Sequence, residues 1–201
     1  MAAANLVCSP HTKEDMYVTY AFNFTGGSLL KWYRDNFGYE EKQLARQQGE
    51  DVYDLFIDRA VDHPTDIYIL PHFAGTGTPY MDTDARGAII GLTLETGKGE
   101  IIKAVLEGIT YEMMVNLECL DRAGVEIEEL RAVGGGAKSE YWLQLKADMM
   151  GKKIVSLNIS EAGTAGVAML AGTAAGIYDS LEDAVDTLVK PKREFYPDEK
   201  Q

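Results

Sequence analysis

Apolar side chains recur at helical spacing along the longest periodic stretch of the chain, residues 98–122. This period predicts a long helix with one face packed on a core. Thr96 precedes the stretch as a candidate cap, and Gly124 follows it as a stop. The apolar positions that share the face are Ile101, Val105, Ile109, Met113, Leu117 and Leu120.

The second half of the chain alternates strand and helix patterns. Strands are predicted at residues 129–133 and 153–157, and helices at residues 139–150, 163–175 and 181–188. This alternation predicts parallel pairing in a layered α/β domain. The helix at 163–175 consists almost entirely of small residues. That composition favours close packing on a sheet, with a ligand-pocket wall as the alternative.

The first half mixes strands and helices. Strands are predicted at residues 17–24, 67–70 and 88–92, and helices at residues 28–37 and 52–61. Trp32 and Trp142 fall on predicted helices beside apolar neighbours, so we expect both side chains to be part of a core.

Three segments lack a regular pattern. Residues 1–16 are predicted to be a ragged N-terminal loop, and residues 191–201 a mobile tail. Residues 72–87 form a long irregular segment rich in glycine, and segments of that length in compact domains are usually functional. Asp82 and Asp84 within it are more typical of a solvated turn than of a metal site.

Composition and charge exclude several classes of protein. The 201 residues include 19 basic and 32 acidic side chains, so the formal net charge is −13. We expect neither nucleic acid nor a membrane surface as a partner, because both require a basic patch. Two cysteines, three histidines and no zinc-binding spacing predict no metal site. The start resembles no secretory signal, so a cytoplasmic setting is expected.

The strongest local motif is a run of three glycines between a predicted strand and a predicted helix. Gly134, Gly135 and Gly136 are followed by Ala137, and Ser139 is placed to cap the helix. Glycines let a flat ligand approach the backbone, and the helix N-terminus attracts phosphate. A nucleotide is therefore the natural occupant, although a tight turn without a ligand is about as common.

Named nucleotide motifs fit this run only in part. A P-loop requires a spacing that the chain does not contain. The dinucleotide motif G-x-G-x-x-G requires glycine at its sixth position, where Ser139 stands, but Glu161 lies near the spacing expected for a ribose contact. A nicotinamide-dependent oxidoreductase domain thus stays open as an alternative at this point.

Several stretches together resemble the C-terminal half of the FGGY-family carbohydrate kinases, the family of xylulokinase and glycerol kinase. Residues 70–80 and 82–92 resemble a core loop of the family, and residues 87–107 its second signature. The resemblance continues, in chain order, through an adenosine motif and a small-residue helix, with a fainter match to an earlier nucleotide-side helix. These last three stretches are residues 133–148, 161–176 and 26–38.

The resemblance implies an α/β fold of the actin/hexokinase/Hsp70 type, with a ribonuclease-H-like core truncated at its N-terminal edge. The whole chain, 1–201, would be the C-terminal nucleotide-binding domain of a sugar kinase. ATP or ADP with Mg²⁺ is the implied cofactor. The adenosine would be held by Gly134, Gly135, Gly136, Ala137 and Ser139, and the nucleotide would also contact Gly27 and Lys31.

The implied reaction is ATP-dependent phosphorylation of a sugar or polyol hydroxyl, most like that of a xylulokinase. The catalytic base, the metal ligands and most sugar contacts would lie in an N-terminal domain, so we expect this chain alone to be inactive. We also expect an uncovered sheet edge to permit self-association into a homo-oligomer. A non-catalytic sugar or nucleotide sensor with the same fold is a further alternative.

Overall fold

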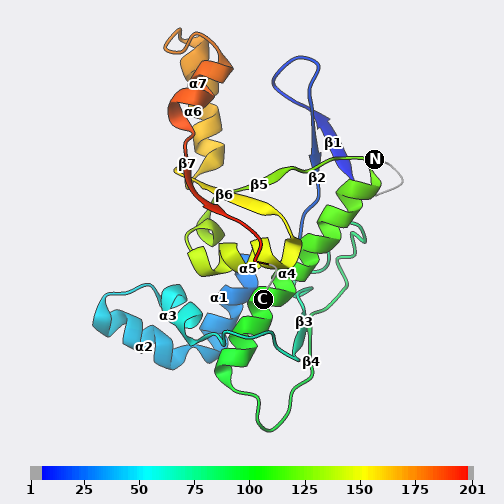
Figure 1. Cartoon of the computed structure of the whole chain (residues 1–201), viewed down its shortest axis with the longest axis vertical. Helices are drawn as coiled ribbons and strands as arrows, with labels where there is room; N and C mark the ends of the chain where they lie inside the picture. The colour runs from blue at the N-terminus through cyan, green and yellow to red at the C-terminus, as the bar shows by residue number, and fades with distance from the viewer. Residues whose placement is uncertain (1–5, 199–201) are drawn as a thin grey trace. The chain divides into compact units, whose positions relative to one another are not determined.

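The computed structural model describes residues 6–198. It divides into two compact units, Met1–Ile127 and Glu128–Gln201, whose elements are labelled in Figure 1. That residues 1–201 form one nucleotide-binding domain stays a prediction. Each unit is described by itself. The first contains β1 (Val7–Pro10), β2 (Tyr17–Tyr20), α1 (Gly27–Phe37), α2 (Tyr39–Gln48), α3 (Val52–Arg59), β3 (Tyr68–Leu70), β4 (Ala88–Ile90) and α4 (Lys98–Arg122).

The long helix α4 forms the centre of the first unit, and its bounds match the predicted helix. The sequence predicted burial of one apolar face, but residues 102–110 are buried on every side of the helix. Elements α1, α3 and β3 all pack against α4, which explains burial on every side. The predicted cap is wrong: the Glu100 carboxylate accepts a hydrogen bond from the Gly97 N–H at 2.6 Å, whereas Thr96 caps the preceding turn.

Strands β3 and β4 pair antiparallel, with Ile69 opposite Ile89. Ile69 is buried, and α4 approaches β3 closely at Gly108. A Cβ added to Gly108 would lie 2.6 Å from the Ile69 carbonyl oxygen. Glycine at this position therefore permits the helix to contact the strand backbone.

Helix α2 was not predicted, because residues 40–48 are mostly polar. Its buried side chains are Glu41 and Ala45. The Glu41 carboxylate lies 2.5 Å from the Arg59 guanidinium and 3.6 Å from the Lys98 ammonium. An ion pair thus replaces the apolar stripe that periodicity analysis depends on.

The N-terminal segment forms a hairpin rather than the loop expected over residues 1–16. Strand β1 pairs antiparallel with β2, from Val7 opposite Tyr20 to Pro10 opposite Tyr17. The prediction is wrong for residues 7–10, because their partner strand supplies the hydrogen bonds that a local pattern does not show. Residues 1–5 lie outside the described residues.

The second unit is built on a three-stranded sheet in the order β5-β6-β7. Strand β5 pairs parallel with β6, as predicted, whereas β7 pairs antiparallel with β6. Helix α5 packs against β6. The elements of this unit are β5 (Glu129–Ala132), a 3₁₀ turn (Gly135–Ala137), α5 (Glu140–Met150), β6 (Lys153–Leu157), α6 (Ala162–Ala174), α7 (Leu181–Leu188) and β7 (Pro191–Phe195).

The tail expected to be mobile over residues 191–201 contains β7, so that prediction is wrong for residues 191–195. Phe195 is buried opposite Ile154 and packs in a core cluster with Leu143 and Ala147. Burial of one aromatic side chain anchors the strand, although its other side chains are exposed. Residues 199–201 lie outside the described residues.

Helix α6 does not bury its small residues along a sheet as expected. Met169 and Gly172 are its buried residues, and the helix packs against α7 (Figure 1). A Cβ on Gly172 would lie 2.6 Å from the Tyr178 ring. The close approach that glycine permits here is therefore to the turn that follows α6.

Candidate functional site

The predicted glycine run lies between β5 and α5 in the second unit. Gly134 has a φ of +83°, a backbone conformation that favours glycine. A 3₁₀ turn follows, in which the Ala137 N–H donates to the Gly134 carbonyl at 3.1 Å. The structure therefore brings Gly134, Gly135, Gly136, Ala137 and Ser139 together in one strand-to-helix connection.

The space around this connection differs between its glycines. A Cβ on Gly134 or Gly135 would meet no atom within 4 Å. A Cβ on Gly136 would meet the Trp142 ring at 3.4 Å and the Lys146 Nζ at 3.8 Å. The first two glycines thus leave the backbone open to a ligand, and the third packs against α5. This openness fits an adenosine lying against the main chain.

Ser139 caps α5 as predicted. Its hydroxyl oxygen accepts a hydrogen bond from the Trp142 N–H at 3.1 Å. The N-terminus of α5, with its positive dipole end, therefore begins directly after the glycine run. This is the arrangement that attracts phosphate or other electron-rich groups to a helix N-terminus.

One charged residue of this region was not predicted. Lys146 is buried, and its Nζ lies 3.8 Å from the centre of the Trp142 ring, which is also buried as expected. Burial lowers the pKa of Lys146 to about 8. The available signal was spacing: Ser139, Trp142 and Lys146 recur at i, i+3 and i+7, which places them on one helix face.

Gly27 and Lys31 belong to the first unit. Gly27 is the first residue of α1, and Lys31 lies one turn further along the same helix. Both are exposed, and a Cβ on Gly27 would meet no atom within 4 Å. The helix N-terminus again offers a favourable end for an anion. Their contact with a nucleotide stays a prediction.

The long segment at residues 72–87 is tied to α4 through a buried carboxylate. Glu112 Oε2 lies 3.2 Å from His72 Nε2, and Glu112 Oε1 accepts from the Thr76 hydroxyl at 3.3 Å. Nearby, Asn116 Nδ2 donates to Asn23 Oδ1 at 2.6 Å. These polar contacts hold the segment against α4. The partner of His72 could not be predicted from the sequence.

Asp82 and Asp84 form the turn that was predicted. The Asp84 N–H donates to Asp82 Oδ1 at 2.8 Å, and both side chains are exposed. Across residues 6–198, no group of three or more His, Cys, Asp or Glu side chains could hold a metal ion. Within the same range no helix is long and apolar enough to cross a membrane.

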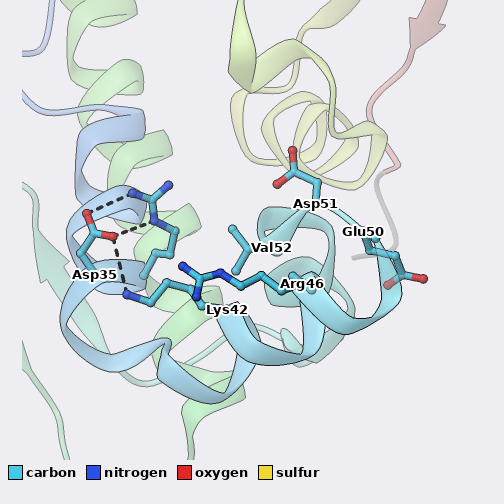
Figure 2. Close-up of a pocket in the computed structure, with 9 residues that line it drawn as sticks. Asp35, Lys42, Arg46, Glu50, Asp51 and Val52 are labelled. Atoms are coloured by element: carbon cyan, nitrogen blue, oxygen red, sulfur yellow. Dashed lines mark hydrogen bonds and ion pairs between the residues drawn. The ribbon is translucent and has the colours of Figure 1, made fainter.

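The first unit also contains a hollow of about 660 Å³ between α1, α2 and α3. Asp35 Oδ1 lies 2.8 Å from the Arg34 guanidinium and 4.0 Å from the Lys42 ammonium. Figure 2 shows Asp35 and Lys42 turned toward one another, whereas Glu50 and Asp51 point away from them. Arg34 and Lys42 are thus both linked to one carboxylate. None of the predicted site residues lines this hollow.

Glu161, on which the dinucleotide alternative depended, is exposed at the start of α6. It lies four positions beyond Leu157, the last residue of β6. The antiparallel β7 also departs from the all-parallel arrangement of a doubly wound dinucleotide half. The geometry of the second unit therefore gives this alternative no support.

Comparisons with known proteins agree on one family. The model described as "FGGY family of carbohydrate kinases, C-terminal domain" matches residues 2–175. A glycerol kinase of Shewanella frigidimarina is 35% identical over 185 residues, which cover 90% of this chain and 35% of the relative. A xylulose kinase of Staphylococcus epidermidis is 30% identical over 194 residues, which cover 96% and 38%.

Solved structures show the same fold. A ligand-bound xylulose kinase from Lactobacillus acidophilus superposes with a TM-score of 0.79 at 25% identity, covering 98% of this chain and 38% of that one. A Plasmodium falciparum glycerol kinase with ADP gives 0.76 at 24% identity, covering 96% and 38%. The predicted actin/hexokinase/Hsp70-type α/β fold is confirmed. The chain spans little more than a third of the length of these relatives.

Proposed function

Because this chain belongs to the FGGY family of carbohydrate kinases, whose C-terminal domain it matches, we propose that it is the nucleotide-binding part of an ATP-dependent sugar or polyol kinase. The observation that carries the proposal is the open backbone of Gly134 and Gly135 directly before the capped N-terminus of α5. Such a turn accepts a flat base and ribose against the main chain.

The residues of this turn would hold ATP through its adenosine. Gly134, Gly135, Gly136 and Ala137 would present backbone groups, and Ser139 would keep the helix N-terminus ordered beside them. In the first unit, Gly27 and Lys31 would contact the nucleotide, where a lysine ammonium suits phosphate. ATP supplies the phosphoryl group, and Mg²⁺ neutralises its charge during transfer.

The substrate proposed for the whole protein is a sugar or polyol, with xylulose as the first candidate. Similar relatives include both xylulose kinase and glycerol kinase. The family resemblance assigns the catalytic base, the metal ligands and most sugar contacts to an N-terminal domain. Cys8 and Cys119 are both unpaired thiols, which fits a reducing cytoplasmic setting.

Titration calorimetry with ADP and with NAD tests nucleotide binding by the purified chain. We expect ADP to bind without any preference for the nicotinamide nucleotide. Gly135→Val should weaken ADP binding at least tenfold, because the added side chain fills open space against which the ligand lies. Gly166→Val places the same side chain in open space on α6 and should leave ADP affinity unchanged. Equal affinity of both variants would contradict the proposal.

An ATP-consumption assay over a panel of sugars and polyols tests the catalytic part. The 201-residue chain alone should give no sugar-dependent turnover, and a longer protein that contains it should phosphorylate one member of the panel. Phosphorylation by the chain alone would overturn the assignment of the catalytic base to another domain. Lack of turnover by the longer protein with every compound would favour a sensor.

A further inference from the structure

Lys146 and Trp142 are two buried residues beside the glycine run. Lys146 is 8% exposed and Trp142 is 5% exposed. The Trp142 Nε1 has no hydrogen-bond partner among the described residues. Within residues 6–198, the Lys146 ammonium has no carboxylate within ion-pair distance. It contacts the face of the Trp142 ring. A lysine this deeply buried is uncommon unless its charge is paired, so the retention of Lys146 calls for a physical reason.

The position of the ammonium indicates that reason. Lys146 Nζ would lie 3.8 Å from a Cβ on Gly136, so it lies next to the backbone of the glycine run. The indole of Trp142 lies between α5 and the same glycine. An acceptor atom of a ligand held by this run would therefore be within reach of the Lys146 ammonium.

Among residues 6–198, no carboxylate forms an ion pair with Lys146. On α5, Glu140 pairs with Arg193, and Asp148 accepts hydrogen bonds from Gln144 and the Asp198 N–H. On β6 and β7, Lys153 pairs with Glu194, and Lys192 is exposed. Burial is the cause of the lowered pKa of Lys146, which lies at about 8. Near that pH the free protein therefore holds this lysine partly neutral.

We propose that Lys146 is a further nucleotide-binding residue, whose ammonium donates a hydrogen bond to an acceptor atom of the adenosine held by Gly134–Gly136. This inference rests on the proposed function of the glycine run. The bound acceptor favours the protonated form of the lysine. Binding must therefore raise the pKa of Lys146 and take up a fraction of a proton from solvent near pH 8.

Calorimetry at about pH 8 in two buffers of different ionisation enthalpy measures this uptake. The ligands are ADP and adenosine, each titrated into the 201-residue chain. We expect proton uptake with both ligands for the wild type. Lys146→Met should abolish the uptake and weaken ADP binding about tenfold, since a hydrogen bond to a charged group is lost. Lys192→Met, at an exposed lysine of the same unit, should behave as the wild type.

The outcomes separate this inference from the proposed function. Failure of the wild type to bind ADP would overturn both. ADP binding with the same affinity and proton uptake in wild type and Lys146→Met would overturn the role of Lys146 and leave the proposed function intact. Proton uptake with ADP but not with adenosine would overturn the adenosine contact.

A second variant covers the possibility that Lys146→Met does not fold. Lys146→Arg keeps the donor and the positive charge but stays protonated at every accessible pH. It should bind ADP within about threefold of the wild type and show no proton uptake. Retained uptake in a folded Lys146→Arg chain, judged by near-ultraviolet circular dichroism, would contradict the assignment.

Discussion

Ser139 acts on the stability of α5 through one hydrogen bond to the Trp142 N–H. Replacing a serine cap by alanine costs about 1 kcal/mol, so Ser139→Ala should lower the free energy of unfolding by that amount. It should also weaken ADP binding, because the frayed helix N-terminus borders the proposed adenosine site. Chemical denaturation and calorimetry measure the two effects.

Ser180 provides the matched control for this prediction. Its hydroxyl accepts from the Asp183 N–H at 3.1 Å and caps α7. Ser180→Ala should cost a similar free energy of unfolding but leave ADP affinity unchanged. If both variants weaken ADP binding equally, the effect of Ser139 is general destabilisation rather than local order.

Glu107 gives the stability of the chain a pH dependence whose sign follows from its burial. Burial raises the pKa of the Glu107 carboxyl, with the Thr65 hydrogen bond and the Lys103 charge acting in the opposite direction. A carboxyl with a raised pKa favours folding below its unfolded pKa, and this contribution is lost as pH rises through the folded pKa. Glu107→Gln stays neutral and can still accept from the Thr65 hydroxyl. Its melting temperature relative to wild type should therefore increase between about pH 4 and pH 7.

Glu40 should show the reverse trend. The Lys98 hydrogen bond lowers the pKa of this exposed carboxyl, so its stabilising contribution is present at neutral pH and lost on acidification. The melting temperature of Glu40→Gln should therefore fall relative to wild type as the pH rises from about 3 to about 5, around and below the unfolded pKa of about 4.3. Parallel trends in the two variants would show that the sign argued for Glu107 is incorrect.

At the scale of elements, alanine substitutions of two helical glycines should change the stability of the fold in opposite directions. Gly108→Ala places a Cβ 2.6 Å from the Ile69 carbonyl oxygen at the contact between α4 and β3, and should destabilise the fold by about 1–3 kcal/mol. Gly166→Ala adds a methyl group in open space on α6 and should stabilise it by about 0.5–1 kcal/mol through helix propensity. Thermal unfolding of both variants checks the pair, and a shift of the same sign in both would contradict the close approach at Gly108.

Strand β7 depends on one side chain. Phe195→Ala should cost about 3–5 kcal/mol, because the ring packs against Leu143, Ala147 and Ile154. Lys192→Ala, at an exposed position of the same strand, should change the free energy of unfolding by less than about 0.5 kcal/mol. Hydrogen exchange of the β7 amides reports the loss directly. If both variants change the free energy of unfolding by the same small amount, residues 191–195 behave as the mobile tail that the sequence predicted.

Elements with local signals could be predicted from the sequence, and elements that depend on distant partners could not. The bounds of α4, α7 and β6 follow from periodicity, a serine cap or alternation, all of which lie within the segment itself. By contrast, α2 depends on the ion pair between the buried Glu41 and the exposed Arg59, and β7 depends on a single aromatic contact. The glycine run is visible as a local pattern, whereas the burial of Lys146 exists only after α5 packs.

At the scale of the whole molecule, net charge opposes the self-association that exposed strands favour. The outer positions of the two-stranded β3–β4 sheet carry exposed Tyr68, Leu70 and Ile90. A net charge of −13 repels a second copy at low ionic strength, and salt screens that repulsion. We predict that the average mass measured by light scattering rises with protein concentration, and more steeply at about 0.5 M salt than at low salt.

Ile90→Lys tests whether this surface carries the association. The added lysine places a charge on an exposed strand, a common protection of sheet edges against pairing. The variant should stay monomeric under conditions in which the wild type associates. A wild-type chain that is monomeric at every concentration and salt level would exclude association through these strands.

The polar contacts of α4 also constrain how the chain can fold during synthesis. Glu107 and Glu112 bond residues 36 to 42 positions earlier in the chain, and Asn116 bonds Asn23 across 93 positions. The segment at residues 72–87 therefore leaves the ribosome before the carboxylate that holds it in place. Native packing of the first unit must wait until α4 has emerged. Until then the nascent chain exposes that segment and the strands beside it, which is the interval in which a chaperone would bind.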